Sequence, residues 1–392
     1  MDDNEIRELL QNYQTPLYCF DIDELAGRVQ HLRDSLPQNV KLAYAAKANT
    51  FIVKEIEPMI DYYEICSPGE FEVCLDQNID LSKIVLSGVY KAEQDIQSYL
   101  ENKLSIGKYT VESLSQLDLL DRLSKKYKQS LDVILRLTSV NQFGMDADTI
   151  FGIIRNQSHY SYLNIVGIQY FSGTQKHSIK VLQKEMNRMV KLIRRLKRDY
   201  GFDAKSFEYG PGLPIDYFSE DFDEETYLRS FKSLLRDIDL DVEIVLEMGR
   251  TIAASCGSYI TTVVDTKINK NVRFAIVDGG IHQITYYGQN MGMRTPPFHL
   301  CQDHPIKGDA AEWNICGALC SVNDILIKSL PITDLRIGDV FVFERAGAYC
   351  PTEGISLFLT RNLPDIILKK GDKMQSVRFD IKTSKINGPH YR

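Results

Sequence analysis

A lysine at the end of an apolar run is the first residue of this chain that could do chemistry. Residues 44–49 read Tyr-Ala-Ala-Lys-Ala-Asn, and the apolar residues before them are typical of a β-strand. Lys47 would then have its stem against a packed core and its amine at the edge of that core. Such burial lowers the pKa of an amine and makes it a candidate nucleophile or Schiff-base former. Taken alone, a lysine in this place is more often an ordinary surface residue.

Glycine-rich segments follow several later strands, and they suggest a second part of the same site. Backbone N–H groups without side chains around them can approach a phosphate closely. The candidates for such a cradle are Gly173, Gly210, Gly212, Gly249 and Arg250. Glu247 could face a pyridine nitrogen and keep it protonated, so that electrons released at a substrate Cα flow into the ring. An amine, a phosphate cradle and an acid together favour pyridoxal 5′-phosphate (PLP) as cofactor.

Short apolar runs alternate with amphipathic runs about eight times before residue 250. Strands are expected near 40–45, 61–65, 82–86, 104–108, 131–137, 163–169, 205–209 and 241–246. Between them, residues 180–199 show the clearest helical spacing of apolar residues before Gly201 ends the pattern. This alternation predicts a (β/α)₈ barrel, whose chemistry lies on the loops after the strands. A doubly wound open sheet is the alternative, but no Gly-x-Gly-x-x-Gly follows the first strand.

The last third of the chain predicts a second, mostly β domain. Helical alternation stops near residue 255, and strands are expected at 257–265, 272–277, 313–316, 339–343 and 365–368. The strand at 17–20 precedes the barrel and could join the sheet of this domain. We therefore expect a barrel domain over 24–255 and a β domain made of 1–23 and 256–392.

Several motifs of the chain resemble those of the barrel-type (fold type III) PLP-dependent decarboxylases, which include diaminopimelate and ornithine decarboxylases. The motifs are Tyr-x-x-Lys-Ala-Asn at 44–49, Ser-x-Gly-Glu at 67–70, Glu-x-Gly-Arg at 247–250, a Gly-x-x-Cys-x-x-x-Asp element at 317–324, and Gly-Ala-Tyr at 347–349. They occur in the family's order, and the resemblance runs from Pro16 to about Pro364. It implies an alanine racemase-like barrel followed by a β domain.

The resemblance also implies roles for single residues. Lys47 would be the lysine that holds the cofactor, and Tyr349 would contact its phosphate. Cys320 and the acid Asp324 would reach into the active site of a partner subunit, so that a homodimer with shared sites is expected. Cys320 or Lys47 would return a proton to Cα. Phe171 stands where the family usually has a histidine that stacks on the ring.

Three departures from the family pattern bear on the substrate. Phe171 can stack but cannot titrate, and Pro211 removes one N–H donor from the Gly210–Gly212 loop. Diaminopimelate decarboxylases carry Cys-Glu-Ser, in which the Glu binds the distal ammonium of the substrate, whereas residues 320–322 here read Cys-Ser-Val. A neutral hydroxyl leaves that ammonium without its counter-charge. The chain therefore looks closer to the branch that acts on carrier-bound or conjugated amino acids in antibiotic and siderophore pathways.

Two arginines complete the candidate site. Arg136, at the end of the strand at 131–137, could contact the cofactor ring or the catalytic carboxyl groups. Arg294 could hold a substrate carboxylate, although a surface loop arginine is an equally good interpretation. On composition alone, Cys320 could be a buried thiol and Tyr349 a core residue.

The composition limits partners and compartment. A net charge of -7 with scattered basic residues argues against nucleic acid or an anionic membrane as partner, and no apolar run is long enough to cross a bilayer. Eight cysteines without a Cys-x-x-Cys pair favour reduced thiols in the cytoplasm. We expect no metal, on the ground that the seven histidines do not cluster with the cysteines. An amino-acid racemase on the same scaffold and a non-catalytic, decarboxylase-like regulator are the alternative functions.

Overall fold

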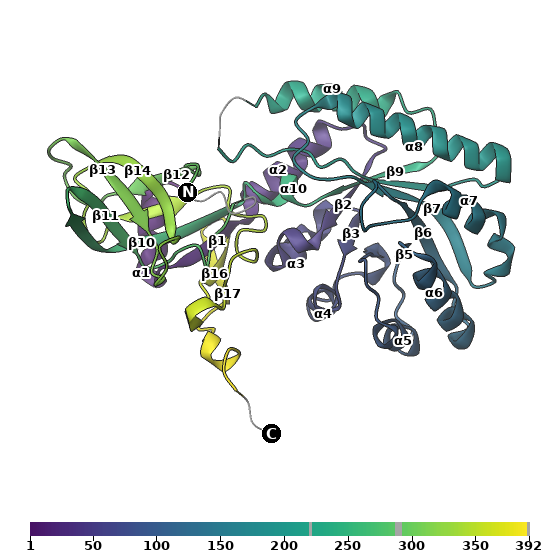
Figure 1. Cartoon of the computed structure of the whole chain (residues 1–392), viewed down its shortest axis with the longest axis horizontal. Helices are drawn as coiled ribbons and strands as arrows, with labels where there is room; N and C mark the ends of the chain where they lie inside the picture. Colours follow the sequence, from purple (N-terminus) through teal and green to yellow (C-terminus); the bar gives the residue numbers. More distant parts are fainter. Residues whose placement is uncertain (219–221, 287–291, 390–392) are drawn as a thin grey trace. The chain divides into compact units, whose positions relative to one another are not determined.

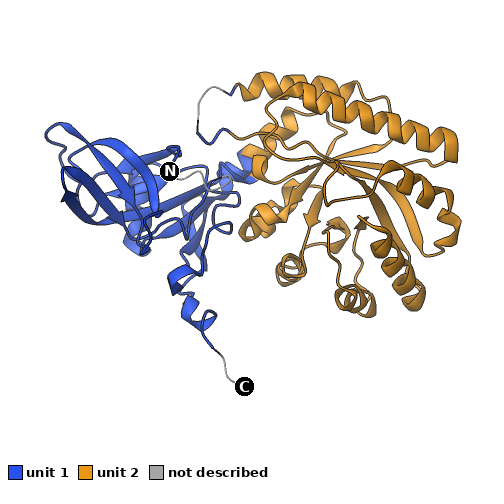
Figure 2. Ribbon diagram, in the orientation of Figure 1, with its two compact units in different colours: residues 1–27, 216–222, 253–392 blue, residues 28–215, 223–252 orange. Residues whose placement is uncertain are grey.

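The computed structural model describes residues 1–218, 222–286 and 292–389. The chain divides into two compact units (Figure 2). One, here called the barrel unit, contains residues 28–215 and 223–252, and the other, the β unit, contains 1–27, 216–222 and 253–392. No described helix combines the length and apolar character needed to cross a membrane.

Eight parallel strands close into a barrel, in chain order from β2 to β9 (Figure 1). Their bounds are β2 Lys41–Ala45, β3 Tyr62–Ile65, β4 Ile84–Leu86, β5 Lys108–Val111, β6 Leu131–Leu137, β7 Leu163–Phe171, β8 Ser206–Gly210 and β9 Glu243–Met248. The last strand pairs with the first, since Ala43 of β2 lies opposite Glu247 of β9. The (β/α)₈ prediction is confirmed, and the open sheet is excluded.

Helices join successive strands of the barrel unit. They are α3 Val53–Ile56, α4 Pro68–Asp76, α5 Glu93–Glu101, α6 Leu114–Tyr127, α7 Ala147–Arg155, α8 Ile179–Tyr200 and α9 Glu224–Arg236. The helix α2 Ile22–Asp34 precedes the first barrel strand, and α10 Arg250–Ala253 follows the last. In α8 the buried residues Leu182, Met186, Met189, Ile193 and Leu196 recur every three or four positions. Each such side chain contributes about 1.5–3 kcal/mol by leaving water. The helix ends at Gly201, whose left-handed backbone (φ 66°) forms its C-cap.

The strand predicted at 104–108 was wrong by about four residues. Leu104 belongs to the turn that follows α5, where its backbone N–H donates to the Tyr99 carbonyl after Lys103 turns left-handed (φ 53°). Gly107 then passes so close to the segment that contains Ser82 that a Cβ at position 107 would lie 2.2 Å from the Ser82 carbonyl oxygen. The strand β5 begins only at Lys108, and the shift brings Glu112 to the C-terminal end of that strand.

The β unit is built on a nine-stranded sheet and opens with the helix α1 Asp3–Asn12. Its strands are β1 Leu17–Asp21, β10 Gly257–Asn269, β11 Val272–Val277, β12 Phe298–Cys301, β13 Ala310–Cys316, β14 Ile325–Thr333, β15 Val340–Phe343, β16 Asp365–Lys370 and β17 Lys373–Arg378. The N-terminal strand lies between β10 and β16, pairing antiparallel with the first and parallel with the second. The prediction that residues 17–20 join the sheet of this domain is confirmed.

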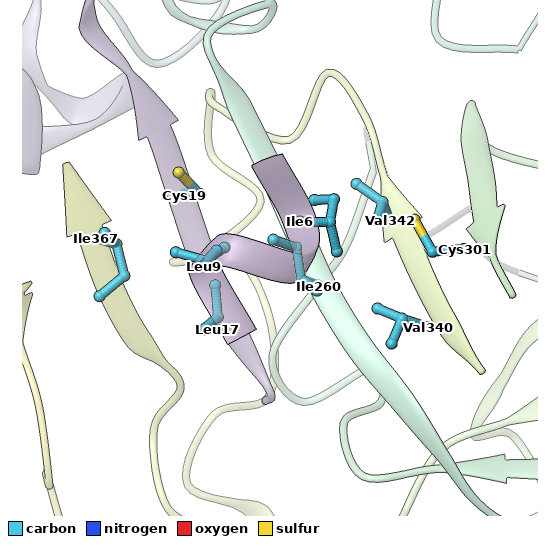
Figure 3. Close-up of a cluster of buried hydrophobic side chains, with 9 residues drawn as sticks. All are labelled: Ile6, Leu9, Leu17, Cys19, Ile260, Cys301, Val340, Val342 and Ile367. Carbon is cyan, nitrogen blue, oxygen red and sulfur yellow. The ribbon is translucent and has the colours of Figure 1, made fainter. Parts of the chain in front are cut away.

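A buried apolar cluster packs α1 onto this sheet (Figure 3). It contains Ile6, Leu9, Leu17, Cys19, Ile260, Cys301, Val340, Val342 and Ile367. The helix contributes Ile6 and Leu9, which are three residues apart and therefore share a face. Its N-terminus is closed by a capping box, in which Asp2 accepts from the backbone N–H of Glu5 and the Glu5 carboxylate accepts from that of Asp2.

Candidate active site

Lys47 lies among acidic side chains at the C-terminal end of the barrel strands. It sits in a single 3₁₀ turn, Ala46–Ala48, directly after β2. Its Nζ is 2.6 Å from Glu64 Oε2, 3.6 Å from Glu247 Oε1 and 3.6 Å from Cys66 Sγ. The side chain is 38% exposed, whereas those of Glu64 and Glu247 are almost completely buried. An amine that is reachable from solvent is therefore held by two carboxyl groups that are not.

The pKa values of Glu64 and Glu247 are shifted in opposite directions. Burial opposes the ionisation of Glu64, but the Lys47 ammonium and the hydrogen bonds from Glu247, Lys47 and Cys66 together lower its pKa. Burial raises the pKa of Glu247 well above its usual range, and the charge of Glu64 raises it further. Two neighbouring carboxylates do not both ionise easily, so these directions favour an ionised Glu64 and a protonated Glu247. Its protonation state then depends on what charge faces it.

A second buried acid is linked to Glu247 through an amide. Gln169 of β7 and Glu208 of β8 are register partners with no exposure to solvent. Gln169 Nε2 donates to Glu208 Oε1 at 2.6 Å and is also 3.5 Å from Glu247 Oε2. Burial raises the pKa of Glu208 to about 7. One amide thus bridges two acids, either of which can carry a proton near neutral pH.

Arg136 has a different acidic partner. Its guanidinium forms an ion pair with Glu112 at 3.2 Å and stacks on the ring of Phe143, 4.9 Å away. Lys91, from the loop after β4, is also buried, and burial lowers its pKa to about 8 despite the attraction of Glu112. The predicted contact of Arg136 with the cofactor ring or the catalytic carboxyl groups stays a prediction, since the acid it contacts is Glu112.

The glycine-rich loops after β7 and β8 lie against each other. A Cβ at Gly212 (φ 60°) would be 2.1 Å from the Gly173 carbonyl oxygen, and one at Gly210 would be 2.4 Å from the Phe171 ring. The backbone N–H of Lys176 donates to the Gly212 carbonyl at 2.9 Å. Glycine at 210 and 212 is thus required by close packing. Gly249 and Arg250, which begins α10, complete the predicted cradle after β9.

Four predicted site residues belong to the β unit, where Cys320 and Asp324 share one loop. Cys320 is exposed between β13 and β14. The buried Asp324 carboxylate accepts from the backbone N–H of Leu319 at 2.7 Å and from that of Ile281 at 2.8 Å. A Cβ at Gly317 would come within 2.3 Å of this carboxylate. Within this chain, Asp324 orders the loop that presents Cys320; its predicted contact with substrate stays a prediction.

The other two residues of the β unit lie in less regular segments. Tyr349 has a left-handed backbone (φ 66°), an uncommon conformation for a residue with a Cβ and often a sign of functional constraint. Arg294 is exposed, and its guanidinium lies 5.6 Å from the centre of the Phe218 ring. Neither geometry decides between the predicted roles and the simpler structural ones.

Five residues of the barrel unit were not singled out from the sequence. Four of them are polar residues in or directly after otherwise apolar strands, and one is a lysine after a strand: Glu64, Glu112, Gln169, Glu208 and Lys91. A polar side chain at an inward position of a barrel strand is expensive to bury without a partner. That interruption of the apolar pattern is the signal that could have found them.

Several buried polar atoms in the described part of the barrel unit have no hydrogen-bond partner, and this is consistent with PLP binding there. Among the described residues, Arg136 Nε, Gln169 Oε1 and Glu208 Oε2 are buried without a hydrogen-bond partner. Buried polar atoms are normally paired, so these are consistent with a polar ligand or ordered water. Lys47 can form the bond to the aldehyde, Glu247 can face the pyridine nitrogen, and the glycine loops can approach the phosphate.

The raised pKa of Glu208 predicts a pH-dependent loss of stability. In the folded chain Glu208 keeps its proton up to about pH 7, whereas in the unfolded chain it ionises near 4.5. The folded state then binds more protons between these values, so the free energy of unfolding falls as pH rises from about 4.5 to about 7. Glu208→Gln should remove this loss, a few kcal/mol at full burial.

Thermal unfolding of the cofactor-free protein at pH 5, 6, 7 and 8 checks this. The difference in Tm between Glu208→Gln and the wild type should grow with pH and become constant above pH 7. Glu243→Gln, a partly exposed acid on β9, is the matched control and should show a constant difference. Parallel curves for Glu208→Gln and wild type would contradict the assignment.

Comparison with known proteins gives a family. Residues 22–254 match the family described as "Pyridoxal-dependent decarboxylase, pyridoxal binding domain". In an alignment of 410 positions, the chain is 25% identical to the L-glutamyl-[BtrI acyl-carrier protein] decarboxylase of Niallia circulans. The alignment covers 96% of this chain and 94% of that protein. The chain is 23% identical over 381 residues to the 2-[(L-alanin-3-ylcarbamoyl)methyl]-2-hydroxybutanedioate decarboxylase of Staphylococcus aureus, covering 91% and 94%.

A solved structure shares the whole fold. Diaminopimelate decarboxylase from Helicobacter pylori, crystallised with L-lysine, matches with a TM-score of 0.84 at 22% identity, over 97% of this chain and 98% of that one. The relatives are decarboxylases, which decides against the racemase and the non-catalytic alternatives. Since the family match spans more than half of the chain and falls on the barrel that carries Lys47, the chain belongs to the pyridoxal-dependent decarboxylases and is a PLP-dependent enzyme of amino-acid metabolism.

Proposed function

We propose that this enzyme removes the α-carboxylate of an amino acid whose far end carries no free ammonium, such as a carrier-bound or conjugated amino acid. The observation that carries the proposal is the loop of Cys320. Residue 321 is a serine, and Val322 beside it is 88% exposed, so the loop offers no carboxylate at these positions. Arg361 Nη2 donates to the Ala318 carbonyl at 2.7 Å, which adds a positive charge to the same loop.

The polar groups of this loop discriminate between substrate classes. A distal ammonium would face the neutral Ser321 hydroxyl and the Arg361 guanidinium, so it would lose water without gaining a counter-charge. A neutral thioester or amide, or a distal carboxylate, avoids this penalty. The relatives from Niallia circulans and Staphylococcus aureus support the proposal, because their names specify a carrier-bound glutamyl group and a conjugate with a carboxylate-rich acid.

The residues of the chain would divide the work as follows. PLP, when bound, supplies an electron sink for the pair released as the Cα–carboxylate bond breaks. Lys47 would hold the cofactor and exchange with the substrate amine. Glu247 would face the pyridine nitrogen, with Gln169 donating toward the Glu247 carboxylate and Glu208 kept protonated below pH 7. Phe171 would stack on the ring, and Arg294 would bind a carboxylate of the substrate.

A substrate panel tests the proposal. Purified holoenzyme is incubated with free meso-diaminopimelate, lysine and glutamate, and with glutamate as carrier-protein thioester and as amide conjugate, while CO₂ release is followed. We expect kcat/KM for the best carrier-bound or conjugated substrate to exceed that for diaminopimelate by about 10²-fold or more, the cost of burying an unpaired charge. Higher kcat/KM for diaminopimelate would reject the substrate class, yet leave decarboxylation established.

We further propose that the enzyme is a homodimer in which Cys320 of the partner subunit serves the site of Lys47. Lys47→Ala and Cys320→Ala should each be nearly inactive. Refolded or exchanged together in equal amounts, they should recover about a quarter of the wild-type activity, because half of the dimers are mixed and each has one intact site. Mixing Lys47→Ala with Glu247→Gln is the matched control. Both changes lie in the barrel unit, so each barrel of a mixed dimer carries one of them and no activity should be recovered. Failure of the first mixture to exceed this control would contradict shared sites.

The compartment is also a proposal. All eight cysteines are free, including the exposed Cys320. Free thiols persist where glutathione and thioredoxin keep them reduced, which supports a cytoplasmic enzyme.

A further inference from the structure

Three side chains of the β unit bring a nitrogen, a sulfur and an oxygen together. Asp3 lies in the first turn of α1, and His299 and Cys301 lie two residues apart on β12, so they share a face of that strand. One ligand atom from each, a carboxylate oxygen, an imidazole nitrogen and Sγ, lies within 4.8 Å of the other two. Cys301 Sγ is 2.9 Å from Asp3 Oδ1.

The imidazole of His299 is oriented as metal-bound imidazoles are. Its Nδ1 is 3.2 Å from Glu344 Oε1, which leaves Nε2 as the second ring nitrogen. Nε2 is shielded from solvent and has no hydrogen-bond partner among the described residues. In metal sites a carboxylate typically accepts from one nitrogen of the ligating histidine and thereby turns the lone pair of the other toward the metal. A buried nitrogen without a partner is otherwise costly.

We propose that Asp3, His299 and Cys301 bind one divalent cation of the zinc type, with solvent as fourth ligand and Glu344 orienting His299. A mixed set of nitrogen, sulfur and oxygen suits zinc, whereas calcium and magnesium take oxygen ligands alone. As the metal binds, the Cys301 thiol loses its proton to solvent. The thiolate and the Asp3 carboxylate then balance the two positive charges of the metal, and the partly buried site is neutral.

The distances match this geometry with small adjustments. Bond lengths of about 2.3 Å to sulfur and 2.0–2.1 Å to nitrogen and oxygen place ligand atoms about 3.3–3.6 Å apart around a tetrahedral zinc. The Cys301–Asp3 contact is shorter than this because it is a hydrogen bond, and it would open as the thiol proton leaves. The other separations between ligand atoms are at most 4.8 Å, so the proposal requires them to shorten as the metal binds.

The expectation that no metal binds rests on histidines and cysteines lying apart, and that premise is wrong at one place. His299-Leu300-Cys301 is a His-x-Cys pair on a single strand. The third ligand, Asp3, could not be found from spacing because α1 reaches β12 only through the fold. A metal there would link α1 to β12. The helix already contacts Cys301 through the apolar cluster that contains Ile6 and Leu9 (Figure 3).

The experiment uses cobalt as a spectroscopic probe of the full chain. Protein treated with EDTA and freed of chelator is titrated with Co²⁺, and the thiolate-to-cobalt charge-transfer band in the near ultraviolet is followed. We expect saturation at one equivalent and loss of the band when Zn²⁺ displaces Co²⁺. Cys301→Ser should abolish the band, while His299→Gln and Asp3→Asn should each weaken binding about tenfold or more. Zn²⁺ should raise Tm of the wild type and leave that of Cys301→Ser unchanged.

Matched variants keep the result interpretable. Cys316→Ser and His304→Gln alter another partly buried cysteine and another partly buried histidine of the same unit. Both should bind cobalt as the wild type does, and circular dichroism should show each variant folded. A band that persists in Cys301→Ser, one lost equally in Cys316→Ser, or a wild type that takes up no stoichiometric cobalt would overturn the site. Because the titration contains neither PLP nor substrate, its outcome is independent of the decarboxylase assignment.

Discussion

Replacing Lys47 by alanine should abolish the cofactor bond and reduce turnover by about 10²–10⁴-fold, the range expected when a group that transfers protons is lost. The 2.6 Å and 3.6 Å contacts of Nζ with Glu64 and Glu247 place this amine among the carboxyl groups of the barrel mouth. The measurements are the visible absorbance of the purified protein with PLP and the adduct fixed by borohydride reduction. Both should be lost, together with CO₂ release.

Lys91 is a rival amine and supplies the control. It is buried, and burial lowers its pKa to about 8, so its amine could also be reactive. Lys91→Ala should keep the adduct, and peptide mapping after reduction should place the pyridoxyl group on Lys47. An adduct that survives in Lys47→Ala and disappears in Lys91→Ala would transfer the cofactor to the other lysine and refute the central assignment.

The barrel could be predicted because its signals are local. Each strand is a short apolar run and each helix an amphipathic one, so the alternation is visible without knowledge of contacts, as α8 and its cap Gly201 illustrate. The error at β5 has a cause that is not local. Residues 104–106 are apolar enough for a strand, but Leu104 closes the turn after α5 and Gly107 passes close to Ser82 of an earlier segment. Only the three-dimensional packing reveals that constraint.

The candidate site was predictable in its outline and not in its electrostatics. Lys47 and Glu247 follow strands and stand in recognisable motifs. Glu64, Gln169 and Glu208 interrupt apolar strands, and this interruption marks them as unusual without identifying their partners. Their importance comes from distances across the barrel, such as the 3.5 Å between Gln169 and Glu247, which no pattern along the chain contains. The sequence shows Cys320 beside a neutral serine. It does not show that the Asp324 carboxylate accepts from the backbone N–H groups of Leu319 and Ile281.

Glu247→Gln should retain PLP and lower kcat by about 10²–10³-fold with little change in KM, a loss comparable to removing one preorganised charge-stabilising group. A carboxylate facing the pyridine nitrogen keeps that nitrogen protonated and able to accept electrons, whereas an amide of the same shape provides no charge. Burial and the nearby Glu64 raise the pKa of Glu247, although the Lys47 ammonium opposes them. A protonated pyridine facing Glu247 would favour its carboxylate form, and the substitution removes this charge without creating a cavity.

The control is the same substitution four residues earlier on the same strand. Glu243 pairs with Lys108 at 3.5 Å and accepts from the Tyr62 hydroxyl at 3.2 Å, near the start of β9. Glu243→Gln should leave kcat within about twofold of wild type, because a partly exposed ion pair contributes little. The absorbance of bound PLP, followed from pH 6 to 9, separates the two effects: Glu247→Gln should lose the protonated-ring species at lower pH than wild type, since the negative charge that raises the pyridine pKa is gone. If its spectrum and kcat resembled those of Glu243→Gln, the carboxylate at 247 would be a structural group and the acid facing the ring would have to be Glu64 or Glu208.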